Sequence, residues 1–227
     1  MYAQARERVI ELVSSADPAA LESTVPATPD WTGRQLLAHL VGVSADVLAQ
    51  RFDMAGTDGW SARQVSERAD TSVADLVDEW RAAAPAFDAA LAGQPLEGMI
   101  GALATDIVQH EFDMRGLLGA PVTEQAAAAM EPALNFMVGF LDRRVKKAGL
   151  AALHVKAGSE EWTLGPGESA VAATLTTTPL ELFRVIAGRR SAAQVTALDW
   201  DGDPTPYLPV LSAFGTLAQS DVHEHLA

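Results

Sequence analysis

The spacing of apolar residues changes near residue 150, and this change limits the possible folds more than any other feature of the sequence. Before Gly149, apolar side chains recur at three- and four-residue steps, the period of amphipathic helices. After it, residues 153–157 alternate between apolar and polar side chains, and residues 171–177 are rich in β-branched types, which is typical of strands. We therefore predict an α+β protein, with an all-helical domain over residues 1–149 and a small α+β domain over residues 150–227.

Capping and stop signals place the individual elements. Thr32 is a candidate N-cap, Gly119 is a stop signal, and Thr178 with Pro179 opens a short helix. Residues 28–32 have the composition of a turn. The expected helices cover about residues 5–14, 33–51, 61–68, 73–92, 99–118, 124–147, 179–187 and 207–217, and the expected strands cover residues 153–157, 161–164, 171–177 and 195–200.

Net charge and cysteine content restrict the partners. The 227 residues include 16 Lys and Arg against 30 Asp and Glu, a net charge of −14, so we predict that the protein binds neither nucleic acid nor an anionic membrane. There is no cysteine, so any thiol chemistry needs an external thiol. The acidic surface shows no long apolar stripe, which favours a monomer or a weak homodimer.

The N-terminal sequence and the apolar runs predict the location of the protein. The first residues mix charges into the first turns and lack the apolar core and cleavage site of a signal peptide. No apolar run approaches the ~20 residues that a membrane-spanning helix needs. We therefore expect a cytoplasmic protein.

One set of side chains has the composition of a metal site. Asp106 and His110 are four residues apart, which places them side by side on one helix face, and His39 lies on the apolar stripe of another helix. If these helices pack together, two imidazoles and a carboxylate converge. Such ligands suit Zn²⁺, and also Ni²⁺, Fe²⁺ or Mn²⁺, with positions left open for substrate. The alternative is that each histidine is a hydrogen-bonded core residue, and spacing alone does not decide between the two.

Further candidates follow on the same predicted helix. Asp113, three residues beyond His110, could orient the imidazole, handle protons with Glu111, or act as a fourth ligand; the alternative is a solvated charge or a pair with Arg115. Arg115 could hold a substrate anion. We take Asp113 and Arg115 as the candidate catalytic residues.

The other histidines are expected at the surface, namely His154, His223 and His225.

Two motifs resemble the mycothiol-dependent maleylpyruvate isomerase family. The first runs from residues 28–32 into residues 36–40, and the second from Asp106 through His110 to Arg115. The resemblance covers nearly the whole chain. It implies a DinB-like metal-binding four-helix bundle followed by a small domain related to sterol carrier proteins. It also implies that His39, Asp106 and His110 bind the metal and that mycothiol is the thiol cosubstrate.

The chain departs from that family at two places. The characterised isomerases have Glu where this chain has Asp106, which implies a small shift of the metal toward the helix that carries it. They also use an arginine late in the second domain for the substrate carboxylate, and this chain has no arginine after Arg190. Arg189, Arg190 or Arg115 could take its place.

The leading functional hypothesis is a metal-dependent enzyme that uses a low-molecular-weight thiol, mycothiol first of all, for thiol addition, transfer or isomerisation on a small electrophile. A bound divalent ion lowers the pKa of a thiol, which would give a thiolate without a protein cysteine. Two alternatives stay open. One is a metalloenzyme that needs no thiol, a hydrolase or a biosynthetic enzyme, and the other is a metal-binding or ligand-binding module without turnover.

Overall fold

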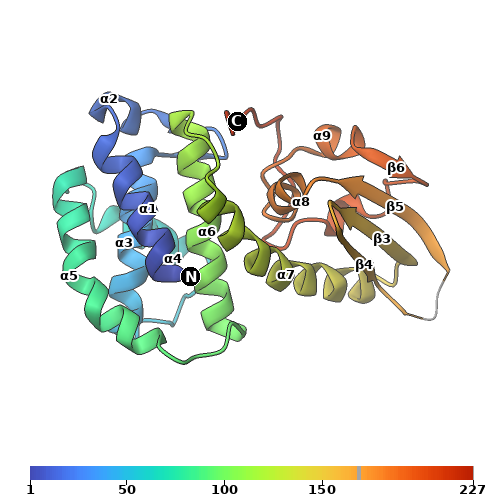
Figure 1. The fold of residues 1–227 in the computed structure, drawn as a ribbon, viewed down its shortest axis with the longest axis horizontal. Helices are drawn as coiled ribbons and strands as arrows, with labels where there is room; N and C mark the ends of the chain where they lie inside the picture. Colours follow the sequence, from blue (N-terminus) through green and yellow to red (C-terminus); the bar gives the residue numbers. More distant parts are fainter. Residues whose placement is uncertain (168–169, 227) are drawn as a thin grey trace. The chain divides into compact units, whose positions relative to one another are not determined.

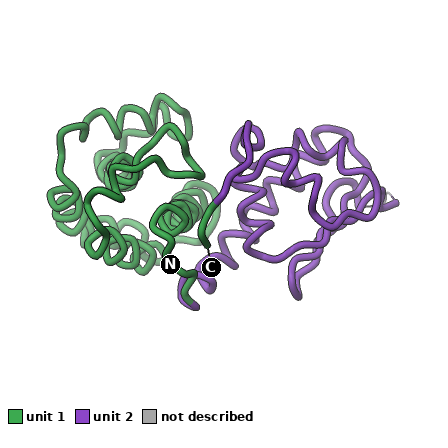
Figure 2. Tube along the Cα trace, turned by 90° about the horizontal axis from the view of Figure 1, so that it is seen from above, with its two compact units in different colours: residues 1–123, 224–227 green, residues 124–223 purple. Residues whose placement is uncertain are grey.

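A computed structural model describes residues 1–167 and 170–226, and the chain divides into two compact units. Unit 1 holds residues 1–123 together with the end of the chain from Glu224, and unit 2 holds residues 124–223 (Figure 2). The mixture of helices and small sheets confirms the predicted α+β class. Among the described helices, none is both long and apolar enough to cross a membrane.

Unit 1 is a helical bundle with a short hairpin. Its elements are α1 (Tyr2–Ser15), α2 (Pro18–Leu21), β1 (Thr24–Val25), β2 (Thr28–Thr32), α3 (Gly33–Leu48), α4 (Asp58–Ser66), α5 (Val73–Leu91) and α6 (Gly98–Leu118). The four longest helices of this unit close a ring, since α1 packs on α5 and α6, and α3 packs on the same two helices (Figure 1). The bundle core is formed by fully buried side chains, among them Val9, Leu36, Leu40, Trp80, Ile107 and Phe112.

The start of α3 fixes the position of its functional face. The Thr32 hydroxyl accepts from the Gln35 N–H at 3.3 Å, and the Thr32 N–H donates to Gln35 Oε1 at 2.9 Å, a capping box that confirms the predicted N-cap. The turn predicted for the preceding residues 28–32 is wrong, because they form β2, antiparallel to β1. Pro29 fits there because a two-stranded sheet has an edge on both strands.

Unit 2 combines one long helix with a four-stranded sheet. Its elements are α7 (Glu124–Lys147), β3 (Ala152–Ala157), β4 (Glu160–Leu164), β5 (Val171–Thr177), α8 (Pro179–Ile186), α9 (Ala192–Thr196), β6 (Asp199–Asp201) and a 3₁₀ turn (Leu208–Val210). The strand order is β4-β3-β5-β6, with β3 and β5 parallel and the other pairs antiparallel. The domain boundary expected after residue 149 lies just beyond the end of α7. Because α7 packs on α8 and β4, it belongs to unit 2.

Two expected elements of unit 2 are wrong. The sequence pattern predicts one strand over residues 195–200, but Ser191 and Gln194 form a capping box that starts α9, and only Asp199–Asp201 pairs with β5. It also predicts a helix over residues 207–217, but only the 3₁₀ turn forms there. Gly215 has a φ of 90°, which a helix does not allow.

Candidate metal centre

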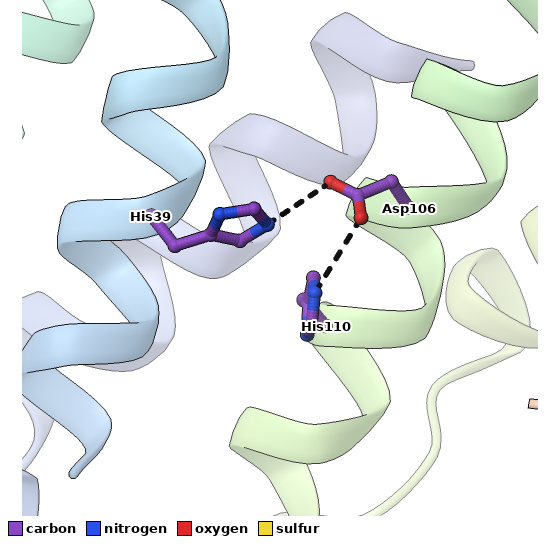
Figure 3. Close-up of side chains that lie close together, drawn as sticks. All are labelled: His39, Asp106 and His110. Carbon is purple, nitrogen blue, oxygen red and sulfur yellow. Dashed lines mark ion pairs between the residues drawn. The ribbon is translucent and has the colours of Figure 1, made fainter. Parts of the chain in front are cut away.

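The structure brings the three predicted ligands together between α3 and α6 (Figure 3). His39 Nε2 lies 3.6 Å from Asp106 Oδ2, and His110 Nε2 lies 3.5 Å from Asp106 Oδ1. One ligand atom from each residue lies within 4.8 Å of the other two. Asp106 and His110 are one turn apart on α6, and α3 packs against α6, so the predicted spacing and the helix packing together produce the cluster.

Each imidazole is held from the side away from Asp106. His39 Nδ1 lies 2.8 Å from Gln64 Oε1, and His110 Nδ1 lies 2.9 Å from Asp113 Oδ2. An amide oxygen and a carboxylate oxygen only accept hydrogen bonds, so both Nδ1 atoms donate. When the rings are neutral, both Nε2 lone pairs therefore face Asp106.

The electrostatics of the site favour a cation. Burial works against a charged imidazole, but the attraction of the Asp106 carboxylate and the hydrogen bond to Asp113 raise the pKa of His110 to about 9. Burial alone would raise the pKa of the Asp106 carboxyl, but His110 and His39 hold it well below its usual range. A proton on His110 thus occupies the place that a divalent ion would take.

Two features of the cluster fit such an ion. Two ligands ~2.0–2.1 Å from a tetrahedral ion are ~3.3–3.4 Å apart. Each Nε2 lies slightly farther than this from an oxygen of Asp106, His39 at 3.6 Å from Oδ2 and His110 at 3.5 Å from Oδ1. Asp106 Oδ2 is buried and has no hydrogen-bond partner, so a coordinated ion would satisfy it. Within the described part of the chain, no other group of three or more histidines and carboxylates meets the same distance criterion.

Trp31 forms part of the surroundings of the cluster. Its ring centre lies 5.0 Å from that of His39 and 6.1 Å from that of His110. Trp31 comes from β2, directly before the cap of α3, and it is half-buried. The structure therefore places an aromatic surface beside both imidazoles.

Asp113 has the geometry of an orienting residue. It is fully buried, and its carboxylate contacts the Nδ1 edge of His110, while the cluster with Asp106 is on the Nε2 edge. Of the roles considered for it, this contact supports orientation of the imidazole rather than direct ligation.

Arg115 is placed in a buried ion-pair cluster with Glu111. Its Nη2 donates to Glu111 Oε1 at 2.9 Å, and its Nη1 donates to the carbonyl of Pro121. Arg8 contacts the other oxygen of Glu111 at 2.6 Å. The role of Arg115 in holding a substrate anion stays a prediction.

The remaining predicted residues lie elsewhere. His154 is on the sheet, where it contacts Glu161 and Thr163, and His223 and His225 are exposed. Gln64, which contacts His39 from a separate helix, is not among the residues predicted from the sequence. No spacing rule links residues on two helices joined by a loop.

We expect metal affinity to rise with pH. A divalent ion binds neutral His110, whose pKa in the metal-free protein is about 9. Below that pH the ion must displace a proton, so affinity increases about tenfold per pH unit and levels off above it. Chelator competition with Zn²⁺ at several pH values measures the slope. An affinity that is flat between about pH 6.5 and 8.5 would contradict proton displacement from His110.

Known proteins resemble this chain in sequence and in fold. Residues 2–118, just over half the chain, match the family described as "Mycothiol maleylpyruvate isomerase N-terminal domain". The crystal structure of the mycothiol-dependent maleylpyruvate isomerase superposes with a TM-score of 0.60 and 12% identity, covering 85% of this chain and 91% of that one. A histidine-to-alanine mutant of the mycothiol-dependent maleylpyruvate isomerase gives 0.61 and 13%, covering 86% and 89%. A search of curated proteins gave no match.

Proposed function

Because the chain belongs to the mycothiol maleylpyruvate isomerase family, we propose that it is a metal-dependent enzyme that uses mycothiol to isomerise a small electrophile. Thiol addition or transfer to such an electrophile belongs to the same proposal, since all three begin with attack by a sulfur nucleophile. The observation that carries it is the cluster of His39, Asp106 and His110. Two imidazoles and one carboxylate leave coordination positions of a divalent ion unfilled by the protein, which is typical of catalytic metal sites.

The residues around the cluster prepare it to hold an ion. His39 and His110 would bind through Nε2, and Asp106 would supply a negative charge and its unpartnered oxygen. Asp113 accepts a hydrogen bond from the Nδ1–H of His110 and fixes the orientation of that ring. A divalent ion in this position would act as a Lewis acid and would lower the pKa of a bound thiol or water.

If the reaction uses a thiol, that thiol must come from outside the protein. With no thiol in the sequence, the protein has no sulfur nucleophile of its own. Both similar crystal structures are of a mycothiol-dependent enzyme, and mycothiol is a small molecule that would supply this nucleophile. That enzyme is a maleylpyruvate isomerase, so maleylpyruvate is the first substrate to test.

The proposal assigns the binding of the substrate carboxylate to an arginine, with Arg115, Arg189 and Arg190 as the candidates. Arg115 contacts Glu111, and Arg190 contacts Glu181 through Nε at 2.6 Å. Each of these two side chains would therefore share or exchange a carboxylate partner when substrate binds.

A metal analysis followed by a thiol titration tests the proposed function. The full chain is prepared without chelator, its metal content is measured, and mycothiol is titrated by calorimetry. Isomerisation of maleylpyruvate is then followed with metal and thiol each present or omitted. We expect stoichiometric metal, saturable thiol binding, and turnover only when both are present.

The other outcomes separate the alternatives. Stoichiometric metal without thiol binding would replace the proposal with a thiol-independent metalloenzyme. Binding of neither metal nor mycothiol would leave a module without turnover. Thiol binding and turnover that persist after the metal is removed would contradict the metal dependence.

A further inference from the structure

We infer that Gln64 and Asp46 are positioning residues that hold His39 in the tautomer and orientation that present its Nε2 to the metal. The inference rests on the metal centre proposed above. It adds that α4 contributes to this centre without supplying a ligand.

The hydrogen bonds of Gln64 have only one possible direction. Its Nε2 donates to Asp46 Oδ2 at 2.7 Å, and a carboxylate at this position accepts but cannot donate. The amide is therefore fixed with its oxygen toward His39, 2.8 Å from Nδ1. Because that oxygen only accepts, His39 must carry its proton on Nδ1, and the lone pair of the neutral ring is on Nε2.

Asp46 is held strongly enough to serve as the fixed end of this chain of contacts. Both Asp46 and Gln64 are fully buried. Arg63 Nη2 contacts Asp46 Oδ2 at 2.9 Å, and Arg51 Nη2 contacts Oδ1 at 2.7 Å. Two guanidinium groups thus compensate a carboxylate that would otherwise be costly to bury.

Gly42 provides the space that Gln64 occupies. His39, Gly42 and Asp46 share one face of α3, at steps of three and four residues. A Cβ at position 42 would lie 2.5 Å from Gln64 Cβ and 2.7 Å from its Cγ. Glycine is unfavourable inside a helix, so its presence here is explained by the close approach of Gln64 between His39 and Asp46.

The two histidines are therefore held by different means. His110 donates directly to the Asp113 carboxylate. His39 donates to a neutral amide, and the Asp46 charge acts on His39 only through Gln64. Without Asp46, the Gln64 amide could rotate and present its NH₂ group to His39, which would favour a proton on Nε2 and block the metal-binding atom.

The test compares variants by Zn²⁺ affinity and by the NMR signal of the His39 Nδ1 proton in the zinc-loaded full chain. Gln64→Met removes the acceptor at nearly constant side-chain length. Asp46→Asn keeps the shape of the side chain but replaces a carboxylate, which only accepts hydrogen bonds, with an amide that can also donate. We expect each to raise the zinc dissociation constant about 10- to 100-fold, the range for outer partners of metal ligands, and to increase the solvent exchange of the Nδ1 proton.

A charge exchange separates positioning from helix packing. In the double variant Asp46→Asn/Gln64→Glu, the carboxylate introduced at position 64 can accept from both His39 and the amide introduced at position 46, so the direction of the contacts is restored. We expect this double variant to recover most of the zinc affinity and the slow solvent exchange of the His39 Nδ1 proton. As the control, Glu79→Gln removes the ion pair between Glu79 of α5 and Arg68, just beyond the end of α4, and leaves the side-chain contacts of Gln64 and Asp46 intact. It should lower stability without changing either measurement.

The results distinguish this inference from the proposed function. If the unsubstituted chain binds no zinc, the metal centre is wrong and this inference falls with it. If the chain binds zinc but Gln64→Met and Asp46→Asn bind it equally well, with the Nδ1 proton unchanged, the metal centre stands and the positioning role is refuted. A loss of affinity in Glu79→Gln equal to that in Gln64→Met would show that the contacts act only by holding α4 in the bundle, which also refutes it.

Discussion

Replacing His110 with alanine is expected to abolish stoichiometric binding of a divalent ion and, with it, metal-dependent turnover. The substitution removes one of three ligands and leaves Asp106 without its nearest positive partner. Loss of an outer partner costs about 10- to 100-fold in affinity, so loss of a ligand should exceed about 100-fold. His39→Ala should have a comparable effect, because its Nε2 faces the same carboxylate. Metal content and chelator competition measure both variants.

His154→Ala is a matched control for these two substitutions. It removes an imidazole from the sheet, where His154 contacts Glu161 and Thr163. It should retain full metal content. Full metal retention in both His39→Ala and His110→Ala would rule out the assigned ligands, and full retention in only one of them would exclude that residue from the ligand set.

The local part of the site could be predicted from the sequence. The helical repeat alone places Asp106 and His110 on one face and puts Asp113 within reach of the same imidazole. The apolar stripe of α3 predicts that His39 faces the bundle interior, and packing of α3 on α6 then brings it to Asp106. These predictions need only the period of a helix and the burial of one face.

The features that the sequence did not predict correctly depend on tertiary contacts or on competing local signals. Gln64 contacts His39 only because α4 packs on α3 over Gly42, and no local pattern encodes that approach. At residues 195–200 the apolar and β-branched residues suggest a strand, but the capping box at Ser191 and Gln194 favours a helix more strongly. Thr178 and Ser191 both cap short helices, so the same kind of signal marks the start of α8 and of α9.

Glu111→Ala is expected to cause a large loss of stability. Glu111 is fully buried between Arg8 and Arg115, with oxygen contacts to both guanidinium groups. Its removal leaves the buried charge of Arg115 uncompensated, which costs about 3–5 kcal/mol in the free energy of unfolding. Denaturant unfolding of the metal-free protein measures this loss, with no contribution from bound metal.

Replacing the pair together tests whether Arg115 is structural. A buried ion pair exchanged for apolar side chains of similar volume is often neutral in stability, so Glu111→Leu/Arg115→Met should recover much of what Glu111→Ala loses. Arg8 is nearer the surface than Arg115 and can turn its charge toward solvent. If Arg115 serves only the fold, the double variant keeps both metal affinity and turnover. If Arg115 holds the substrate anion as predicted, the double variant keeps the metal but its KM for substrate rises, because the ligand set does not include either residue.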